Sequence, residues 1–313
     1  MKRTGLLTAT AVGLAMAAIG PAADAHSPYL QPTQFAPTRG YVAVLAALTD
    51  EVYFVPDFAL RGEGFFLVDP EGRRSEIKNV APMKSFVAAE ADLPADGTYR
   101  ITTGERTGRS AKFAKIDGRW LAVRQPRPGQ QQGQEAQQGQ PRQRAEGQQA
   151  GQMERGAPQG APAAGGERPR AIDEADLPAG AETAEMQAVT VAETYVTRGA
   201  PSDAAVKTVG KGFELKPLIH PNEIFLDTGF PFEILMDGKP AEGVALEVFR
   251  GGNAYDDKKV YGEVTTDAAG RATVAFDRPG VYVLTTRYPG RPAPGEAPPP
   301  RSYSYALTVE VTL

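Results

Sequence analysis

Short runs in which apolar and polar residues alternate recur along most of the chain, and this period of two predicts β-strands. The run Tyr41–Leu48 is apolar enough to predict a buried strand. In the stretch AKFAKIDGRWLAVR, alternating residues stand on both sides of Asp117-Gly118. This pair predicts a two-residue hairpin turn in which both central residues have positive φ. The first half of the chain is therefore expected to be rich in β-structure.

The same pattern continues from Lys211 to the end of the chain. Asp237-Gly238 stands between two alternating runs in FEILMDGKPAEGVALEVF and predicts a second hairpin. Two further turns, Asp-Ala-Ala-Gly and Arg-Pro-Gly, separate the three alternating runs of YGEVTTDAAGRATVAFDRPGVYVLTTRY. The region contains about seven predicted strands in about 100 residues, a count and spacing typical of an immunoglobulin-like sandwich. No cysteine pair supports a true immunoglobulin domain.

A segment of different composition interrupts the first β-rich region. Residues Gln125 to Arg170 contain no Val, Ile, Leu or aromatic residue and are rich in Gln, Gly and Pro. Such a segment buries too little apolar surface to offset the entropy lost on ordering, so we predict a disordered insert over about residues 125–185. A sticky, Gln-rich interaction segment is the functional alternative.

The strand predicted over Met186–Gly199 is expected to return to the first domain, so that the insert lies within that domain. A simple linker between two domains is the alternative. The predicted fold class is all-β, with two immunoglobulin-like β-sandwich domains over residues 26–209 and 210–313.

The N-terminus has the three parts of a secretory signal peptide. A basic start, MKR, precedes an apolar run from Leu6 to Ile19, and ADA supplies small residues up to Ala25. The apolar run is too short to anchor the chain stably in a bilayer. We predict that residues 1–25 are cleaved off after Ala25, so that the mature protein begins at His26 and is periplasmic or secreted. No later stretch approaches about 18 uninterrupted apolar residues, so no transmembrane segment is expected after the signal is removed.

Composition narrows the chemistry that the chain can support. It has no cysteine, so an exported form must rely on core packing, and any metal site must use nitrogen and oxygen ligands. The formal net charge of −4 argues against a nucleic-acid partner, which would require a basic face.

The two histidines of the chain, His26 and His220, are both candidate metal ligands. Cleavage after Ala25 would give His26 a free α-amine, and this amine and the imidazole Nδ1 can close one chelate ring on a metal. The imidazole of His220 would complete a three-nitrogen histidine brace, which suits Cu(II) and accepts Ni(II) or Zn(II). Each histidine also has a plainer interpretation. His26 is then an incidental first residue, and His220 a solvated strand-end residue held extended by Pro221.

Signatures of catalysis are missing from the sequence. It holds no Gly-x-Ser-x-Gly, no His-Glu-x-x-His and no phosphate-binding loop. Two histidines without a cysteine leave little for Ser-His-Asp or Cys-His catalysis, and no carboxylate pair stands out for glycoside hydrolysis. The stretch NAYDDKK, residues 253–259, lacks the ligand spacing of a calcium loop and is predicted to be a solvated loop. We therefore predict that the protein is not an enzyme.

Several of these segments together resemble a known family. The predicted signal ends in Ala-His, an aromatic-Leu-x-Pro motif follows as YLQP, and the C-terminal half carries DGKPAEGVALEVF and TTDAAGRATVAFDRPGVYVLTTRY. The chain resembles the bacterial periplasmic family of unknown function once labelled the periplasmic component of a cobalt and nickel transporter (NikM-like). Its C-terminal half is also similar to carboxypeptidase-regulatory-like and transthyretin-like β-sandwich modules. The resemblance implies two β-sandwich domains, periplasmic residence and a mature N-terminal histidine at His26. The chain departs from the family pattern in its long insert and in Tyr29, where Trp is expected.

Two functions from different classes remain open at this point. In the first, the protein is a metal-handling accessory that binds Cu, Ni or Co through His26 and serves an envelope transporter. In the second, it is a non-catalytic module that recognises a protein, a glycan or an outer-membrane receptor through its loops.

Overall fold

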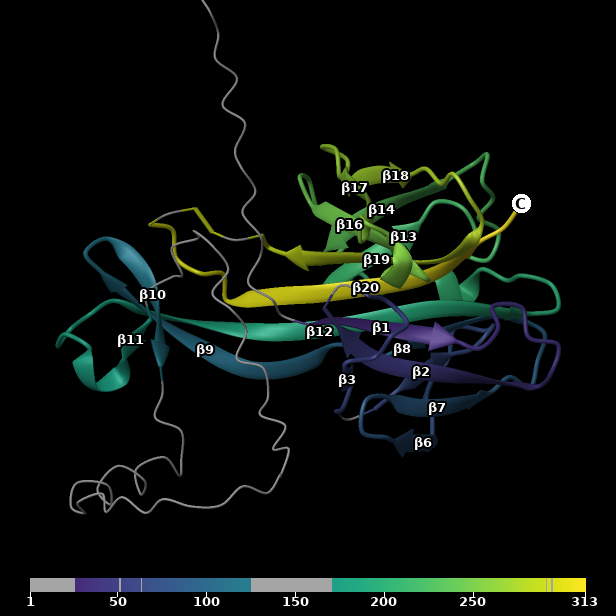
Figure 1. Ribbon diagram of the computed structural model, residues 1–313, viewed down its shortest axis with the longest axis horizontal. Coiled ribbons are helices and arrows are strands. Elements are labelled where there is room, and N and C mark those ends of the chain that lie inside the picture. The colour runs from purple at the N-terminus through teal and green to yellow at the C-terminus, as the bar shows by residue number, and fades with distance from the viewer. Residues whose placement is uncertain (1–25, 51, 63, 125–170, 291, 294) are drawn as a thin grey trace, which may run out of the picture.

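A computed structural model describes residues 26–50, 52–62, 64–124, 171–290, 292–293 and 295–313, and this part of the chain is built from β-strands (Figure 1). Its helical segments are the short 3₁₀ turns η1 (Glu174–Asp176), η2 (Ala204–Val206) and η3 (Asn253–Tyr255). The predicted all-β fold class is confirmed. The predicted signal peptide and most of the predicted insert lie outside the described residues. Within the described ranges, no helix is long and apolar enough to cross a membrane.

The first sheet comes from the N-terminal part of the chain, coloured purple to blue in Figure 1, and its strand pairs are antiparallel. Its strands follow the order β1-β2-β7-β6, and the short β3 pairs with the end of β2. Their bounds are β1 (Ser27–Pro32), β2 (Tyr41–Thr49), β3 (Phe58–Ala59), β6 (Asn79–Pro82) and β7 (Val87–Asp92). Alternate residues of β2, among them Val42, Val44 and Ala46, are buried. The strand predicted over Tyr41–Leu48 is therefore confirmed.

The second sheet has 11 strands and contains segments from both halves of the chain. Its main path is β11-β10-β9-β12-β20-β19-β16-β17, and β8, β4 and β5 branch from β12. The bounds are β4 (Phe66–Val68), β5 (Arg74–Glu76), β8 (Gly97–Thr102), β9 (Arg106–Ile116), β10 (Arg119–Arg124), β11 (Ile172–Asp173), β12 (Thr183–Arg198), β16 (Ala245–Arg250), β17 (Val260–Thr265), β19 (Gly280–Tyr288) and β20 (Arg301–Val311). The 16-residue β12 is antiparallel to β9 and β8 along one edge and parallel to β20 along the other. The two halves of the chain are therefore joined through β12.

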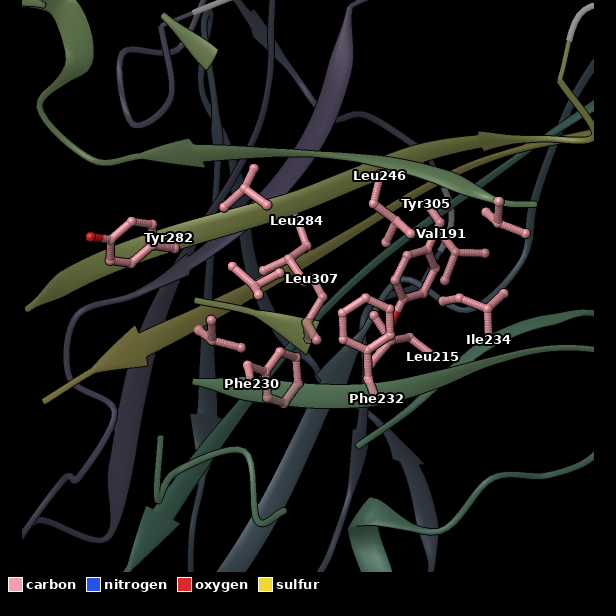
Figure 2. Close-up of a cluster of buried hydrophobic side chains, with 14 of the residues drawn as sticks. Val191, Leu215, Phe230, Phe232, Ile234, Leu246, Tyr282, Leu284, Tyr305 and Leu307 are labelled. Atoms are coloured by element: carbon pink, nitrogen blue, oxygen red, sulfur yellow. The ribbon is translucent and has the colours of Figure 1, made fainter. Parts of the chain in front are cut away.

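The third sheet belongs to the C-terminal half and packs face to face against part of the second. It contains β13 (Phe213–Pro217), β14 (Phe230–Met236), β15 (Lys239–Pro240) and β18 (Arg271–Val274). Figure 2 shows the core between the two sheets, to which several strands contribute Val191, Leu215, Phe230, Phe232, Ile234, Leu246, Tyr282, Leu284, Tyr305 and Leu307. Two sheets that bury their facing apolar sides in this way form a β-sandwich.

Both faces of β12 are buried, each in a different core. Val189, Val191 and Tyr195 belong to the core of the C-terminal sandwich. Ala192 and Val196, on the opposite face, belong to the core beneath the first sheet. Because successive side chains of a strand point to opposite faces, one strand can complete two cores.

A single sheet contains strands from both of the regions predicted as domains, residues 26–209 and 210–313. A third apolar cluster also bridges the halves. It joins side chains of the N-terminal half to side chains of the C-terminal half: Tyr29, Ala47, Tyr53, Phe249, Val283 and Ala306. The alternation along each strand predicts which residues are buried, but it carries no information about the partner across the core.

The two predicted hairpin turns form, with one difference. Asp117 and Gly118 have φ of 49° and 76° and connect β9 to β10, which confirms the first hairpin. Asp237 and Gly238 also have positive φ, 51° and 73°, but the returning strand β15 has only two residues. The chain then crosses to the second sheet, where β16 pairs with β17 and β19. The prediction that the strand ending at Phe249 completes this hairpin is therefore wrong. The residues of a turn set the local φ angles, but the sheet that the following strand joins depends on residues far away in the sequence.

The predicted disorder extends too far at its C-terminal end. Residues 171–185 contain β11, η1 and the start of β12. Ile172 pairs in parallel with Val123 of β10, and Thr183 pairs with Ala114 of β9. The apolar side chains that return after Arg170 allow the chain to add to an existing sheet. The remainder of the predicted insert, residues 125–170, lies outside the described residues.

Candidate functional site

The candidate site lies where β1 begins, at the first described residue. The antiparallel register pairs Ser27 with Thr49, so His26 and Asp50 are neighbours just beyond the paired ends of β1 and β2. His26 Nδ1 contacts Asp50 Oδ1, forming a hydrogen bond or, when the ring is protonated, an ion pair. The side chains are 38% and 50% exposed, so the pair is open to solvent.

An aromatic wall limits the movement of the His26 ring. The centroid of the Phe58 ring in β3 lies 4.6 Å from the centroid of the imidazole, and the two ring planes make an angle of 53°. Phe58 is opposite Leu48 in the sheet, which fixes its backbone beside the end of β2. The imidazole is therefore held between a carboxylate and a phenyl ring.

A second carboxylate holds Asp50 in place. Asp57 Oδ2 accepts hydrogen bonds from the Asp50 backbone N–H at 3.1 Å and from the Thr49 hydroxyl at 3.2 Å. Thr49 is fully buried at the end of β2. These bonds tie the loop after β2 to the sheet, so that the position of Asp50 is set by its backbone.

Buried aromatic side chains form the floor under this loop. Tyr29 lies 5.7 Å from Tyr53 and 5.4 Å from Phe54 between ring centroids, and Phe54 adopts a φ of 68° that is unusual for a bulky residue. Burial raises the pKa of Tyr53 to about 12. Burial first, and then the charge of Asp57, raise the pKa of Tyr29 well above its ordinary value. Both phenols are therefore neutral near pH 7.

His220, the other predicted ligand, lies in a hydrogen-bonded network. Its Nδ1 accepts the Asn222 backbone N–H at 3.3 Å, so Nε2 carries the proton of the neutral ring and donates to Thr98 Oγ1 at 2.9 Å. The hydroxyls of Thr98 and Thr197 are 2.9 Å apart, and Thr197 donates to Asn222 Oδ1 at 2.8 Å. The network closes on itself and occupies both ring nitrogens, which favours a structural role for His220.

The structure does not bring His26 and His220 together. His26 precedes Ser27 at one end of β1, whereas Asn222 of the His220 network donates to the Phe35 carbonyl beyond the other end. The two histidines therefore belong to opposite ends of β1, whose six residues span about 20 Å at 3.3 Å per residue. Two imidazoles at that separation cannot share one ion.

In the described part of the chain, no three or more His, Cys, Asp and Glu side chains converge in a way that could hold a metal ion. The site at β1 has two such side chains, those of His26 and Asp50. The main chain can offer a further donor there. The α-amine created by the predicted cleavage is such a donor, because it belongs to His26 itself.

The fold and the site together define an all-β protein in which a central strand joins two cores and an exposed histidine–carboxylate pair lies beside the ends of β1 and β2. The chain belongs to the DUF4198 family, described as a domain of unknown function, whose pattern matches residues 23–290. No curated protein matches it. Among solved structures, the chain is similar to trypsin-activated alpha-2-macroglobulin from Escherichia coli, with 12% identity and a TM-score of 0.18. The similarity covers 90% of this chain, which spans 15% of that protein's length.

Proposed function

We propose that the protein is an exported metal-handling accessory that binds Cu(II), or alternatively Ni(II) or Co(II), through His26 after cleavage behind Ala25. The observation that carries the proposal is the position of His26, which is solvent-accessible and has its Nδ1 turned toward a carboxylate. The α-amine and Nδ1 of one residue form a chelate ring without help from the rest of the fold. The reference pKa of an α-amine is about 7.7–8.0, and a bound metal lowers it further, so both nitrogens are available near neutral pH.

We also propose that the protein resides in the periplasm, belongs to the NikM-like group and contains two immunoglobulin-like sandwich units. It would deliver the ion to an envelope transporter or outer-membrane receptor. The facing sheets of the C-terminal half support the sandwich assignment. His220 is left out of the proposed site because its two ring nitrogens already have partners.

Calorimetric titration of the mature protein with CuCl₂ tests the proposal. The protein should begin at His26, and the matched control should carry one additional glycine before His26. That residue converts the α-amine into an amide and leaves every side chain unchanged. We expect binding of one equivalent of Cu(II) that is at least tenfold weaker in the control. Equal affinity in the two proteins, or no binding by the mature protein, would remove the proposed site.

A second candidate function is favoured by the sheet that extends beyond the two cores. In Figure 1, β9, β10 and β11 project away from the sandwich, and β10 carries Trp120, the single tryptophan of the chain. An extended sheet with a partly buried aromatic residue suits a module that binds a glycan or a protein. Fluorescence of Trp120 titrated with soluble peptidoglycan fragments tests this alternative. A saturable change that survives a metal chelator would support it, and an unchanged spectrum would speak against a glycan.

A further inference from the structure

We propose that Asp50 is the third ligand of the metal site at His26, an assignment that rests on the proposed function. Two independent requirements lead to the same nitrogen atom. A chelate ring with the α-amine can use Nδ1 but not Nε2, because only Nδ1 closes a six-membered ring. The structure, without reference to any metal, turns that same Nδ1 toward Asp50 Oδ1.

The two side chains must move slightly apart to admit an ion between them. Nitrogen and carboxylate ligands of a transition metal lie about 2.0–2.2 Å from the ion. Two donors on adjacent corners of a square plane are then about 3 Å apart. His26 Nδ1 and Asp50 Oδ1 are already in contact, so a small opening of the pair admits the ion in place of the shared proton.

The fold holds His26 and Asp50 next to each other. The pairing of Ser27 with Thr49 places their backbones side by side. Asp57 accepts the Asp50 N–H and thereby fixes the loop, and Phe58 packs against the imidazole. Asp57 is accordingly a positioning residue, and Asp50 is the ligand. A site held in this way loses little side-chain freedom when an ion binds.

The completed donor set has consequences for the class of metal. It consists of an amine nitrogen, an imidazole nitrogen and a carboxylate oxygen, and the chain has no cysteine to supply a thiolate. Such nitrogen and oxygen donors select Cu(II) over Cu(I), which prefers soft sulfur ligands. Three ligands leave at least one position of a square plane open to water or to a donor from a partner protein. The site is therefore suited to holding an oxidised ion that is later passed on.

The test compares Asp50→Asn with Asp227→Asn in mature protein that begins at His26. Both substitutions remove one negative charge from an exposed side chain, but Asp227 lies in the C-terminal half, between β13 and β14. Affinity for Cu(II) is measured by competition with glycine, and the ligand set by electron paramagnetic resonance. We expect Asp50→Asn to weaken Cu(II) binding at least tenfold and to shift the parallel g and hyperfine values. Asp227→Asn should stay within twofold of wild type with an unchanged spectrum.

The outcomes separate the two proposals. If wild-type protein does not bind Cu(II), or binds it equally with a glycine added before His26, the proposed function itself is wrong. If wild type depends on the free amine but Asp50→Asn keeps both its affinity and its spectrum, only the assignment of Asp50 is overturned. A weakened affinity with an unchanged spectrum also overturns it, because Asp50 then acts through its charge alone. Circular dichroism of the Asp50→Asn protein, whose altered side chain is half exposed, verifies that it is folded.

Discussion

Replacing Tyr305 with phenylalanine tests a polar contact that is buried where β12 and β20 meet. The Tyr305 hydroxyl donates to Glu193 Oε2 at 3.0 Å, and both residues are buried. Arg100 Nη1 lies 3.9 Å from the other carboxylate oxygen. Burial first, and then the charge of Glu193, raise the pKa of Tyr305 well above its ordinary value. The hydroxyl therefore stays protonated and acts as a donor to a buried anion.

The expected loss of stability follows from this geometry. Tyr305→Phe removes one hydrogen-bond donor and leaves the ring in place, so it creates no cavity of side-chain size. A hydrogen bond to a charged group contributes about 1.5–3 kcal/mol, and we expect the free energy of unfolding to fall by about that amount. Tyr303→Phe, two residues earlier in β20, is the matched control. Its hydroxyl accepts a 3.3 Å bond from the half-exposed Arg301, for which water competes, so its loss should cost less than the loss at Tyr305.

Urea unfolding followed by circular dichroism measures both free energies. A double-mutant cycle with Glu193→Gln isolates the contact, and we expect a coupling energy between the two sites of at least about 1 kcal/mol. Equal losses for the two tyrosine substitutions, or additive effects of Tyr305→Phe and Glu193→Gln, would refute the view that this hydrogen bond stabilises the junction of the two halves.

Three other perturbations have expected outcomes. Thr98→Val removes the acceptor for His220 Nε2 and should lower the free energy of urea unfolding by about 1–3 kcal/mol; no change would contradict a structural role for His220. Burial raises the pKa of Tyr53 to about 12, so its phenol keeps its proton in the folded state while the unfolded chain ionises from about pH 10. The free energy of unfolding should therefore fall by up to about 3 kcal/mol as the pH rises from 10 to 12. In Tyr53→Phe the free energy of unfolding should fall less steeply over this pH range, and an unchanged slope would contradict the prediction. The Lys259 ammonium donates to the carbonyls of Asn253, Ala254 and Asp256 at 2.7–3.1 Å, in the position a cation would take. Calcium should therefore leave the Tm unchanged, and Lys259→Met should accelerate hydrogen exchange in residues 253–258; a rise in the Tm of the wild type with calcium that Lys259→Met alters would contradict this view of the loop.

The candidate site shows where prediction from the sequence ends. His26 was found from the signal-peptide pattern and from the chemistry of an N-terminal histidine, neither of which depends on the fold. Asp50 was missed, because its place beside His26 depends on the pairing of β1 with β2. The segment Ser27–Pro32 has prolines at both ends of its apolar stretch and shows no long alternation that would predict a strand. The end of the Tyr41–Leu48 strand was the one available signal, since Asp50 follows it closely.

For His220, the sequence identifies the residue but not its partners. The sequence suggested either a second metal ligand or a solvated residue at the end of a strand. The structure places it in a network with Thr98, more than 100 residues earlier in the chain, and with Thr197. Hydroxyl partners so far away leave no trace in the residues around His220. A partly buried network of this kind can be recognised only when the strands that carry it have been brought together.

The sequence by itself determined the all-β class and the positions of the turns at Asp117-Gly118 and Asp237-Gly238. Alternation with a period of two and positive φ at Asn, Asp and Gly are local properties, set by the backbone and side chains of a few adjacent residues. Only the tertiary structure decided that β12 completes two cores, that β16 leaves its predicted hairpin partner, and that His26 meets Asp50. Each of these features depends on which apolar faces, distant in the sequence, pack against one another. The free energy gained by burying them is a property of the assembled sheets and not of any single segment.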